Sequence, residues 1–203
     1  MFSGMSSILG LTITFWAVYS TNIDLSSFLE RLVGLGYSVG KVYTIPGGDY
    51  YIEYLSDGSL ARKSTNEGSI RIIYDSGRKA LGVIAPNRDL SVVGLAEFYR
   101  ALSEAKIPEP PITELFISYT DNLQICPTRS LKYMNMELSE RGTTLLWGEP
   151  QGKSMYVMIT PVSSERSLIM IGARGEWGFT IGILRNINEL FLEVRKFNCK
   201  GGG

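Results

Sequence analysis

The side chains that most often carry out chemistry in proteins are scarce in this sequence. Histidine is absent from its 203 residues, which removes the usual general base, the Ser-His-Asp and Cys-His arrangements, and every zinc site that uses imidazole. Its two cysteines, Cys126 and Cys199, have no second cysteine or histidine nearby. They therefore predict neither a metal site nor the disulfide framework of a small secreted domain. We interpret them as reduced thiols and expect no metal and no cofactor.

Carboxylates offer a second possible chemistry. Asp75 together with Glu53 or Asp57 would supply the two acids of a glycosidase, but their spacing does not fix the separation that such a pair needs. The sequence also contains no phosphate-binding P-loop, no GxSxG nucleophile elbow, no dinucleotide fingerprint and no CxxC pair. We therefore expect a protein that is not an enzyme.

Composition and charge describe an ordinary globular chain. The 20 lysines and arginines balance the 20 aspartates and glutamates, and 44% of the residues are hydrophobic, so no strongly basic field indicates a polyanionic partner. An apolar run from Ile8 to Val18 is interrupted by Thr12 and Thr14 and has no preceding lysine or arginine. It resembles a secretion signal only loosely, and no other run is long enough to cross a membrane. We expect a cytoplasmic protein without a membrane span.

The first half of the chain alternates between strand and helix patterns. Asp24 is a suitable N-cap for a short helix in which apolar residues at 25, 28, 29, 32 and 33 share one face. Asp89 similarly predicts the start of a second helix that runs to about Ala105. The polar string over 56–68 predicts an exposed loop. Strand patterns cover Leu11 to Tyr19, Val39 to Ile45, Tyr50 to Leu55, Ile70 to Tyr74 and Ala80 to Ala85.

A proline-rich tract over 107–111 separates this half from a second half of similar order. Pro127 and Thr128 predict the start of a helix with Leu131, Met134 and Leu138 on one side, ending by Gly142. A closing helix is predicted from about Thr180 to Phe197. Strands are predicted over 115–119, 143–147, 155–160 and 168–173.

Both halves thus give the order strand, helix, three or four strands, helix. We infer an internal duplication, with a first repeat over 8–106, a boundary over 107–111 and a second, degenerate repeat over 112–198. The order predicts the α+β class, with an antiparallel sheet and the helices segregated to one face. The predicted strands over 155–159 and 168–171 are apolar on both faces, so something besides the helices must cover the other face. A partner protein, a second copy of the chain and a nucleic acid surface are all suitable.

Several short motifs, in this order, resemble the TATA-box-binding protein family. They are Asn22-Ile23-Asp24-Leu25 at the passage from strand to helix, Ile45-Pro46-Gly47 at a turn, the hairpin from Ile70 through Ser76-Gly77-Arg78, and the acidic start of the helix at Asp89. In order and spacing the likeness extends over most of the chain, but at the level of motifs it covers the first half. The resemblance implies a saddle of two tandem repeats whose concave sheet face binds the minor groove of double-stranded DNA in a transcription-related role.

The resemblance also assigns roles to individual residues. Ile45 and Tyr74 occupy the places of the phenylalanines that wedge between base steps in the family, and Arg78 occupies the place of a phosphate-facing lysine. Thr12 takes the place of an asparagine in the first strand, and Trp147 stands near the second wedge turn. An apolar wedge unstacks a base step at a cost of about a few kcal/mol, which is offset when the kinked duplex contacts more protein.

A second hypothesis uses the same sheet face differently. The zero net charge, together with Glu149 and Glu165 in the second half, favours a protein-interaction or self-dimerising module whose apolar face is buried against a protein partner or a second copy. The sequence leaves both hypotheses open.

Overall fold

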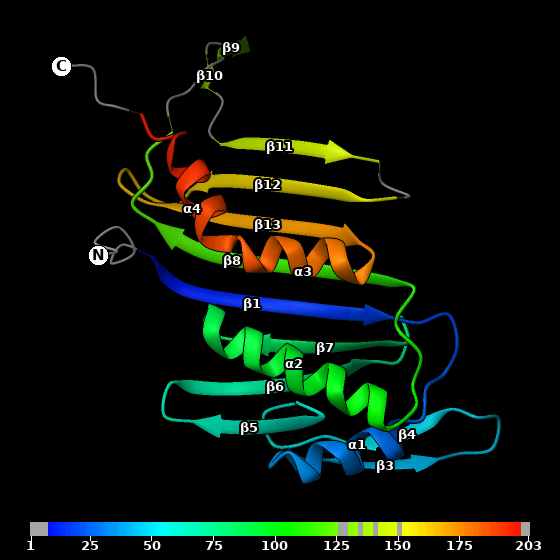
Figure 1. The fold of residues 1–203 in the computed structure, drawn as a ribbon. Coiled ribbons are helices and arrows are strands. Elements are labelled where there is room, and N and C mark those ends of the chain that lie inside the picture. Colours follow the sequence, from blue (N-terminus) through cyan, green and yellow to red (C-terminus); the bar gives the residue numbers. More distant parts are fainter. Residues whose placement is uncertain (1–7, 126–129, 134–135, 140–141, 150–151, 200–203) are drawn as a thin grey trace.

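The computed structural model describes residues 8–125, 130–133, 136–139, 142–149 and 152–199. Its main feature is a nine-stranded antiparallel sheet in the order β11-β12-β13-β8-β1-β7-β6-β5-β2 (Figure 1). The strands of this sheet are β1 (Leu9–Val18), β2 (Ser38–Val39), β5 (Ala61–Thr65), β6 (Gly68–Asp75), β7 (Ala80–Ala85), β8 (Ile112–Asp121), β11 (Thr143–Gly148), β12 (Ser154–Pro161) and β13 (Ser167–Gly175). Two separate hairpins pair β3 (Lys41–Thr44) with β4 (Tyr50–Glu53), and β9 (Ser130–Tyr133) with β10 (Met136–Ser139).

Four helices are described, and they lie on one side of the sheet (Figure 1): α1 (Leu25–Gly34), α2 (Arg88–Glu104), α3 (Trp177–Arg185) and α4 (Ile187–Arg195). Helix α2 approaches the sheet so closely that a Cβ on Gly94 would lie 2.8 Å from Ile70 Cγ2. Helix α3 is joined to β8 by a buried hydrogen bond of 2.7 Å between the hydroxyls of Thr113 and Thr180. The α+β class and the large antiparallel sheet are therefore confirmed.

The centre of the sheet is formed by β1 and β8, one from each half of the chain. They run antiparallel with Phe15 directly opposite Leu115, and both side chains are buried under the helices. The remaining first-half strands follow β1 on one side, and β13, β12 and β11 follow β8 on the other. Both halves consequently share one sheet and one continuous apolar core.

Helix α1 forms where its apolar spacing predicts it. Asp24 is the N-cap, and its carboxylate accepts hydrogen bonds from the Ser27 backbone N–H at 3.0 Å and from the Ser27 hydroxyl at 2.6 Å. The second N-cap differs from the expected one, because α2 begins at Arg88 and Asn87 Oδ1 accepts from the Leu90 N–H at 2.8 Å. Asp89 lies instead in the first turn, where a negative charge favours the positive end of the helix dipole.

The expected loop over 56–68 is wrong in its second part, because β5 lies there. Leu60 and Ala61 at the start of this segment are fully buried. The long side chains that follow concealed the alternation of a strand: Lys63 points to the helix side and forms an ion pair with Glu97 of α2, while its neighbour Arg62 points to the other face. Such side chains bury their methylene stems and keep their charges accessible.

The predicted helix from Pro127 is also wrong where the structure describes it, since β9 and β10 are antiparallel strands with Leu131 opposite Leu138. Residues 127–129 and Met134 lie outside the described residues. A short apolar spacing fits either type of element. The closing helix is divided into α3 and α4 at Asn186. Six apolar residues fit the helical period on which that prediction rests. Ile183 and Leu190 are half-buried, and the buried ones are Leu184, Ile187, Phe191 and Val194.

The expectation of reduced thiols is wrong for Cys199, which is disulfide-bonded. Its backbone N–H also donates to the Gln124 carbonyl at 2.7 Å, which holds the segment after α4 near the end of β8. Cys126 lies outside the described residues. This correction removes one of the grounds for the expected cytoplasmic location. None of the described helices is long and apolar enough to span a bilayer.

Candidate functional site

The helices leave one face of the nine-stranded sheet uncovered, and we call it the open face. It consists of the side chains that point away from the helices, such as Thr12, Thr14 and Trp16 of β1, while Ile13 and Phe15 between them are buried. The strand registers align one row of open-face residues across eight strands. From the β5 side to β11 the row is Arg62, Arg71, Ile84, Thr14, Phe116, Gly172, Tyr156 and Leu146.

The first-half end of this face is cationic and polar. Arg62 on β5 lies directly opposite Arg71 on β6, and Ser64 lies opposite Ser69 in the same ladder. Arg62 Nη1 lies 3.5 Å from Asp57 Oδ2, whereas no ion pair joins Arg71 to another residue in the described part of the chain. Arg71 and Ser69 line a hollow of about 370 Å³. An anion that enters this hollow would meet the Arg71 guanidinium and the Ser69 hydroxyl, and also the Asp57 carboxylate, which lines the same hollow.

Asp57 lines this hollow and remains charged. The Ser59 hydroxyl donates to its carboxylate at 2.6 Å, and this hydrogen bond is the main cause that lowers the pKa of Asp57, with a smaller contribution from Arg62. The carboxylate therefore neutralises Arg62 in part and leaves Arg71 as the more available cation.

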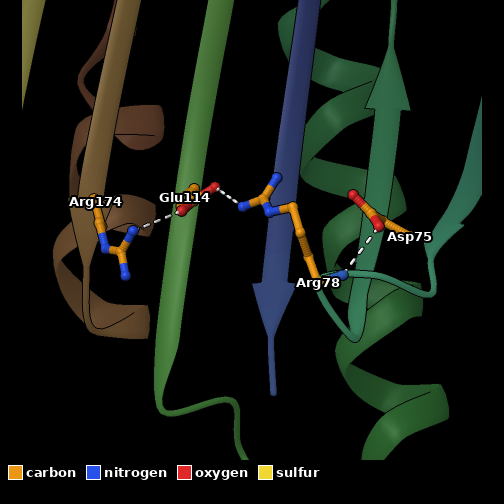
Figure 2. Close-up of polar contacts among 4 residues, drawn as sticks. All are labelled: Asp75, Arg78, Glu114 and Arg174. Atoms are coloured by element: carbon orange, nitrogen blue, oxygen red, sulfur yellow. Dashed lines mark hydrogen bonds and ion pairs between the residues drawn. The ribbon is translucent and has the colours of Figure 1, made fainter. Parts of the chain in front are cut away.

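The centre of the open face holds a buried carboxylate between two arginines (Figure 2). Glu114 on β8 pairs through Oε2 with Arg78 Nη2, and through Oε1 with Arg174 Nη1 at 3.2 Å. The backbone N–H of Arg78 donates to Asp75 Oδ1 at 3.1 Å, which fixes the turn between β6 and β7. The Arg78 guanidinium also lies over the Trp16 ring, 5.4 Å from its centroid.

This cluster leaves two guanidinium groups partly exposed on the surface. The side chains of Arg78 and Arg174 are 42% and 45% exposed, while that of Glu114 is 9% exposed. The two guanidinium groups share the Glu114 carboxylate, and the Asp75 carboxylate of the same cluster accepts from the Arg78 backbone. The donors of both guanidinium groups extend toward solvent. Arginine forks of this kind suit planar acceptors and phosphate oxygens.

Two glycines allow aromatic rings to lie flat along the open face. Gly82 on β7 is opposite Trp16 and Ile73, and Gly172 on β13 is opposite Phe116 and Tyr156. The Trp16 ring covers Gly82, and the Tyr156 ring covers Gly172 in the same way. Because neither glycine has a side chain, each ring can lie close to the backbone. At Gly172 the surface is hollowed, with Glu114 and Arg174 among the lining residues.

The second-half end of the open face is apolar. Tyr156, Met158, Leu168 and Met170 are half-buried on it, and Leu146 at the edge is 81% exposed. The two ends of the open face therefore differ in character, with arginines and serines at one end and methionine and leucine at the other.

The residues predicted from the sequence do not form one site. Thr12 and Arg78 both lie on the open face, near opposite ends of β1. Tyr74 is 8% exposed and lies on the helix side of β6 with Ile70 and Ile72, where burial raises the pKa of its hydroxyl. Trp147 also lies on the helix side, with its ring stacked on Phe179 of α3 at 5.7 Å.

Ile45 lies apart from all of these, at the turn between β3 and β4 outside the nine-stranded sheet. Asn22 Nδ2 donates to the Gly48 carbonyl at 2.7 Å, so this turn is fixed near the start of α1. The exposed Ile45 side chain is thus presented beside the sheet and not on its open face.

Sequence reasoning missed the residues that dominate the open face, namely Trp16, Arg71, Glu114, Phe116 and Arg174. The sequence carries part of the signal for Arg71, because the period-2 alternation of β6 puts it on the side opposite Ile70, Ile72 and Tyr74, but it does not say which side faces the helices. Comparison with known proteins adds no relative to this description: no protein-family model matches the chain, and no curated protein matches it.

Proposed function

We propose that the protein is a non-enzymatic, transcription-related DNA-binding protein whose open face contacts the minor groove of a duplex. The observation that carries this proposal is the cross-strand pair of Arg62 and Arg71. Like charges directly opposite each other in a sheet are destabilising, so the sheet tolerates a repulsion that a phosphate between the two guanidinium groups would relieve. Arginine binds phosphate through two parallel hydrogen bonds.

The centre of the open face supports the same partner. The minor groove presents the acceptors N3 of adenine and O2 of thymine, and the exposed end of Arg174 is a donor. Phe116, which is 38% exposed, is the side chain best placed to press against a base step, a role that the family resemblance gives to Tyr74. Arg78 keeps its proposed role toward phosphate, and the Thr12 hydroxyl lies on the same face.

We also infer the internal repeat and the saddle. In the first half Trp16 lies opposite Gly82, and in the second half Phe116 lies opposite Gly172. Across the two central strands Trp16 lies opposite Glu114, and in the equivalent pair Phe116 lies opposite Thr14. A two-fold rotation about the Phe15–Leu115 pair relates these registers. The relation supports repeats over 8–106 and 112–198 that curve into a saddle, with the second repeat degenerate.

A second candidate function is supported by the other end of the open face. Leu146, Met158 and Met170 lie there, on the face that the described helices leave uncovered. The chain also has no net charge. An apolar patch of this kind is typical of a protein-interaction surface. In this alternative the open face is buried against a protein partner or a second copy, and binding is insensitive to salt.

Fluorescence anisotropy with a labelled duplex, at about 50 and 200 mM salt, tests the proposal. We expect affinity that falls steeply with salt, and we expect Arg71→Gln to weaken it and to reduce the salt slope by about one. Arg100→Gln is the matched control, because Arg100 is an exposed arginine on α2 paired with Glu104. Absence of binding at micromolar protein in both salts would remove the proposal, and equal effects of the two variants would remove the role of Arg71.

A further inference from the structure

The two edges of the nine-stranded sheet differ in length and chemistry. At one edge β2 has two residues, which offers little backbone for pairing. At the other edge β11 has six residues, Thr143–Gly148, with no charge and no proline among them. Within the described ranges, β12 is the one strand that pairs with β11. Among the described strands, the outer N–H and C=O groups of β11 therefore form the longer unpaired edge.

This edge also exposes large apolar side chains on both of its faces. Leu146 on the open face is 81% exposed, and Trp147 on the helix side is 58% exposed. Sheet proteins normally protect an edge by shortening it or by adding charges, prolines or bulges. The β11 strand has no charge, no proline and no bulge, and it is six residues long. The β2 edge, by contrast, is protected because β2 is only two residues long.

We propose that β11 pairs antiparallel with β11 of a second copy of the chain, which joins the two sheets into one across a two-fold axis. Antiparallel pairing keeps residues of the same face opposite each other. Centred on Leu146, it places Leu146 opposite the second copy's Leu146, Leu145 opposite Trp147, and Thr144 opposite Gly148. The strand carries no charge, so this self-pairing brings no like charges together.

A two-fold interface uses the same surface on both copies. Antiparallel pairing of β11 with itself meets this requirement, because each copy contributes the same strand. The apolar pairs on the two faces are of the kind that stabilises neighbouring strands. Trp147 is already held against Phe179 of its own chain, so little side-chain freedom is lost when it contacts Leu145 of the second copy. The interface is separate from the Arg62–Arg71 end of the open face, and it does not depend on DNA binding.

Sedimentation velocity of the full chain over a range of concentrations tests the inference. We expect a reversible dimer that persists when the salt is raised from about 50 to 500 mM, because no ion pair contributes to it. Leu146→Lys would place two like charges opposite each other on the axis and should weaken dimerisation at least tenfold. The exposure of Leu146 means that this variant should keep its fold, which circular dichroism checks.

Leu192→Lys is the matched control, because Leu192 is an exposed leucine on α4, away from the edge. It should leave the dimer intact. Phe116→Lys tests for a different dimer, in which the open faces of two copies pack against each other. This variant should also leave the β11 dimer intact. The inference is overturned if the parent protein is a monomer at all concentrations, if Leu146→Lys remains fully dimeric, or if either control dissociates the dimer equally.

Discussion

Trp16 on β1 and Gly82 on β7 lie directly opposite each other, and the indole ring fills the space that a Gly82 side chain would need. A Cβ at Gly82 would lie 2.9 Å from Trp16 Cε3 and 2.8 Å from Ile73 Cγ1. Because Trp16 also supports the Arg78 guanidinium, this one close approach determines how the centre of the open face is arranged.

Gly82→Ala should therefore displace Trp16. We expect it to lower the free energy of unfolding by about 1–3 kcal/mol, as overpacking does, and to shift the tryptophan fluorescence. Chemical denaturation measures the first effect. Gly34→Ala is the control, since nothing lies within 4 Å of a Cβ at Gly34 in α1, and it should be neutral or stabilising by about 0.4–1 kcal/mol. Equal stability of the two variants would show that Trp16 is free to move.

Arg71→Gln should affect stability and binding in opposite directions. Removal of one of two opposed guanidinium groups relieves a cross-strand repulsion, so the free energy of unfolding should rise at low salt. The gain should shrink as salt screens the repulsion. Urea denaturation at two salt concentrations measures it. A variant that is less stable at low salt would indicate that Arg71 has a stabilising role within the sheet.

Glu114→Gln should strengthen duplex binding, because it removes the carboxylate that Arg78 and Arg174 share. The same change removes two charge-assisted contacts, and we expect it to cost about 1.5–3 kcal/mol of stability. Anisotropy and thermal unfolding measure the two effects on the same sample. Weaker duplex binding by a folded variant would contradict the expectation and would indicate that Glu114 positions the arginines for DNA.

Phe191→Ala should be strongly destabilising. The Phe191 ring packs against Tyr119, with 4.6 Å between centroids, and it anchors α4 to β8. Truncation of such a buried aromatic costs about 3–5 kcal/mol. Its exposed neighbour Leu192 provides the control, and Leu192→Ala should change stability by less than about 0.5 kcal/mol. Similar denaturation midpoints for both variants would contradict the placement of α4.

Asp24→Ala should remove the N-cap of α1 and cost about 1 kcal/mol near neutral pH. Hydrogen bonds from Ser27 lower the pKa of the Asp24 carboxyl in the folded protein. The cap therefore contributes fully above the unfolded-state pKa of about 3.9, and it is lost as the pH falls further and the carboxyl is protonated. Asp24→Asn keeps a capping oxygen without titrating, so its stability relative to the parent should depend on pH. Denaturation between neutral and acidic pH checks this, and a difference between Asp24→Asn and the parent that does not change with pH would contradict it.

The elements that could be predicted are those whose side chains carry a strong apolar period. The α1 helix and the strand Ala80–Ala85 match their expected positions because each buries apolar side chains in a regular pattern. Strand β5 was missed because Ala61 is its one fully buried residue and precedes a polar run. The break at Asn186 was missed because the apolar period continues across it.

The open face was harder to predict than the fold, because it depends on pairing between distant strands. Arg71, Ile73 and Asp75 alternate with Ile70, Ile72 and Tyr74, and both sets include apolar residues. The sequence of β6 alone therefore does not say which set faces the helices. Register with β7 and the packing of α2 make that choice, and they place Tyr74 in the core.

The central position of β1 and β8 has a consequence for synthesis of the chain. Strand β1 is among the first segments made, but its partner β8 begins only at Ile112, after the whole first half. The first half is finished with α2 at Glu104, and β8 ends at Asp121. At about 5–20 residues per second, about 1–3 seconds pass in which a finished first half displays β1 with one side unpaired. Nascent chains of this protein are thus most prone to associate wrongly with each other during that interval, and translation of Ile112–Asp121 ends it.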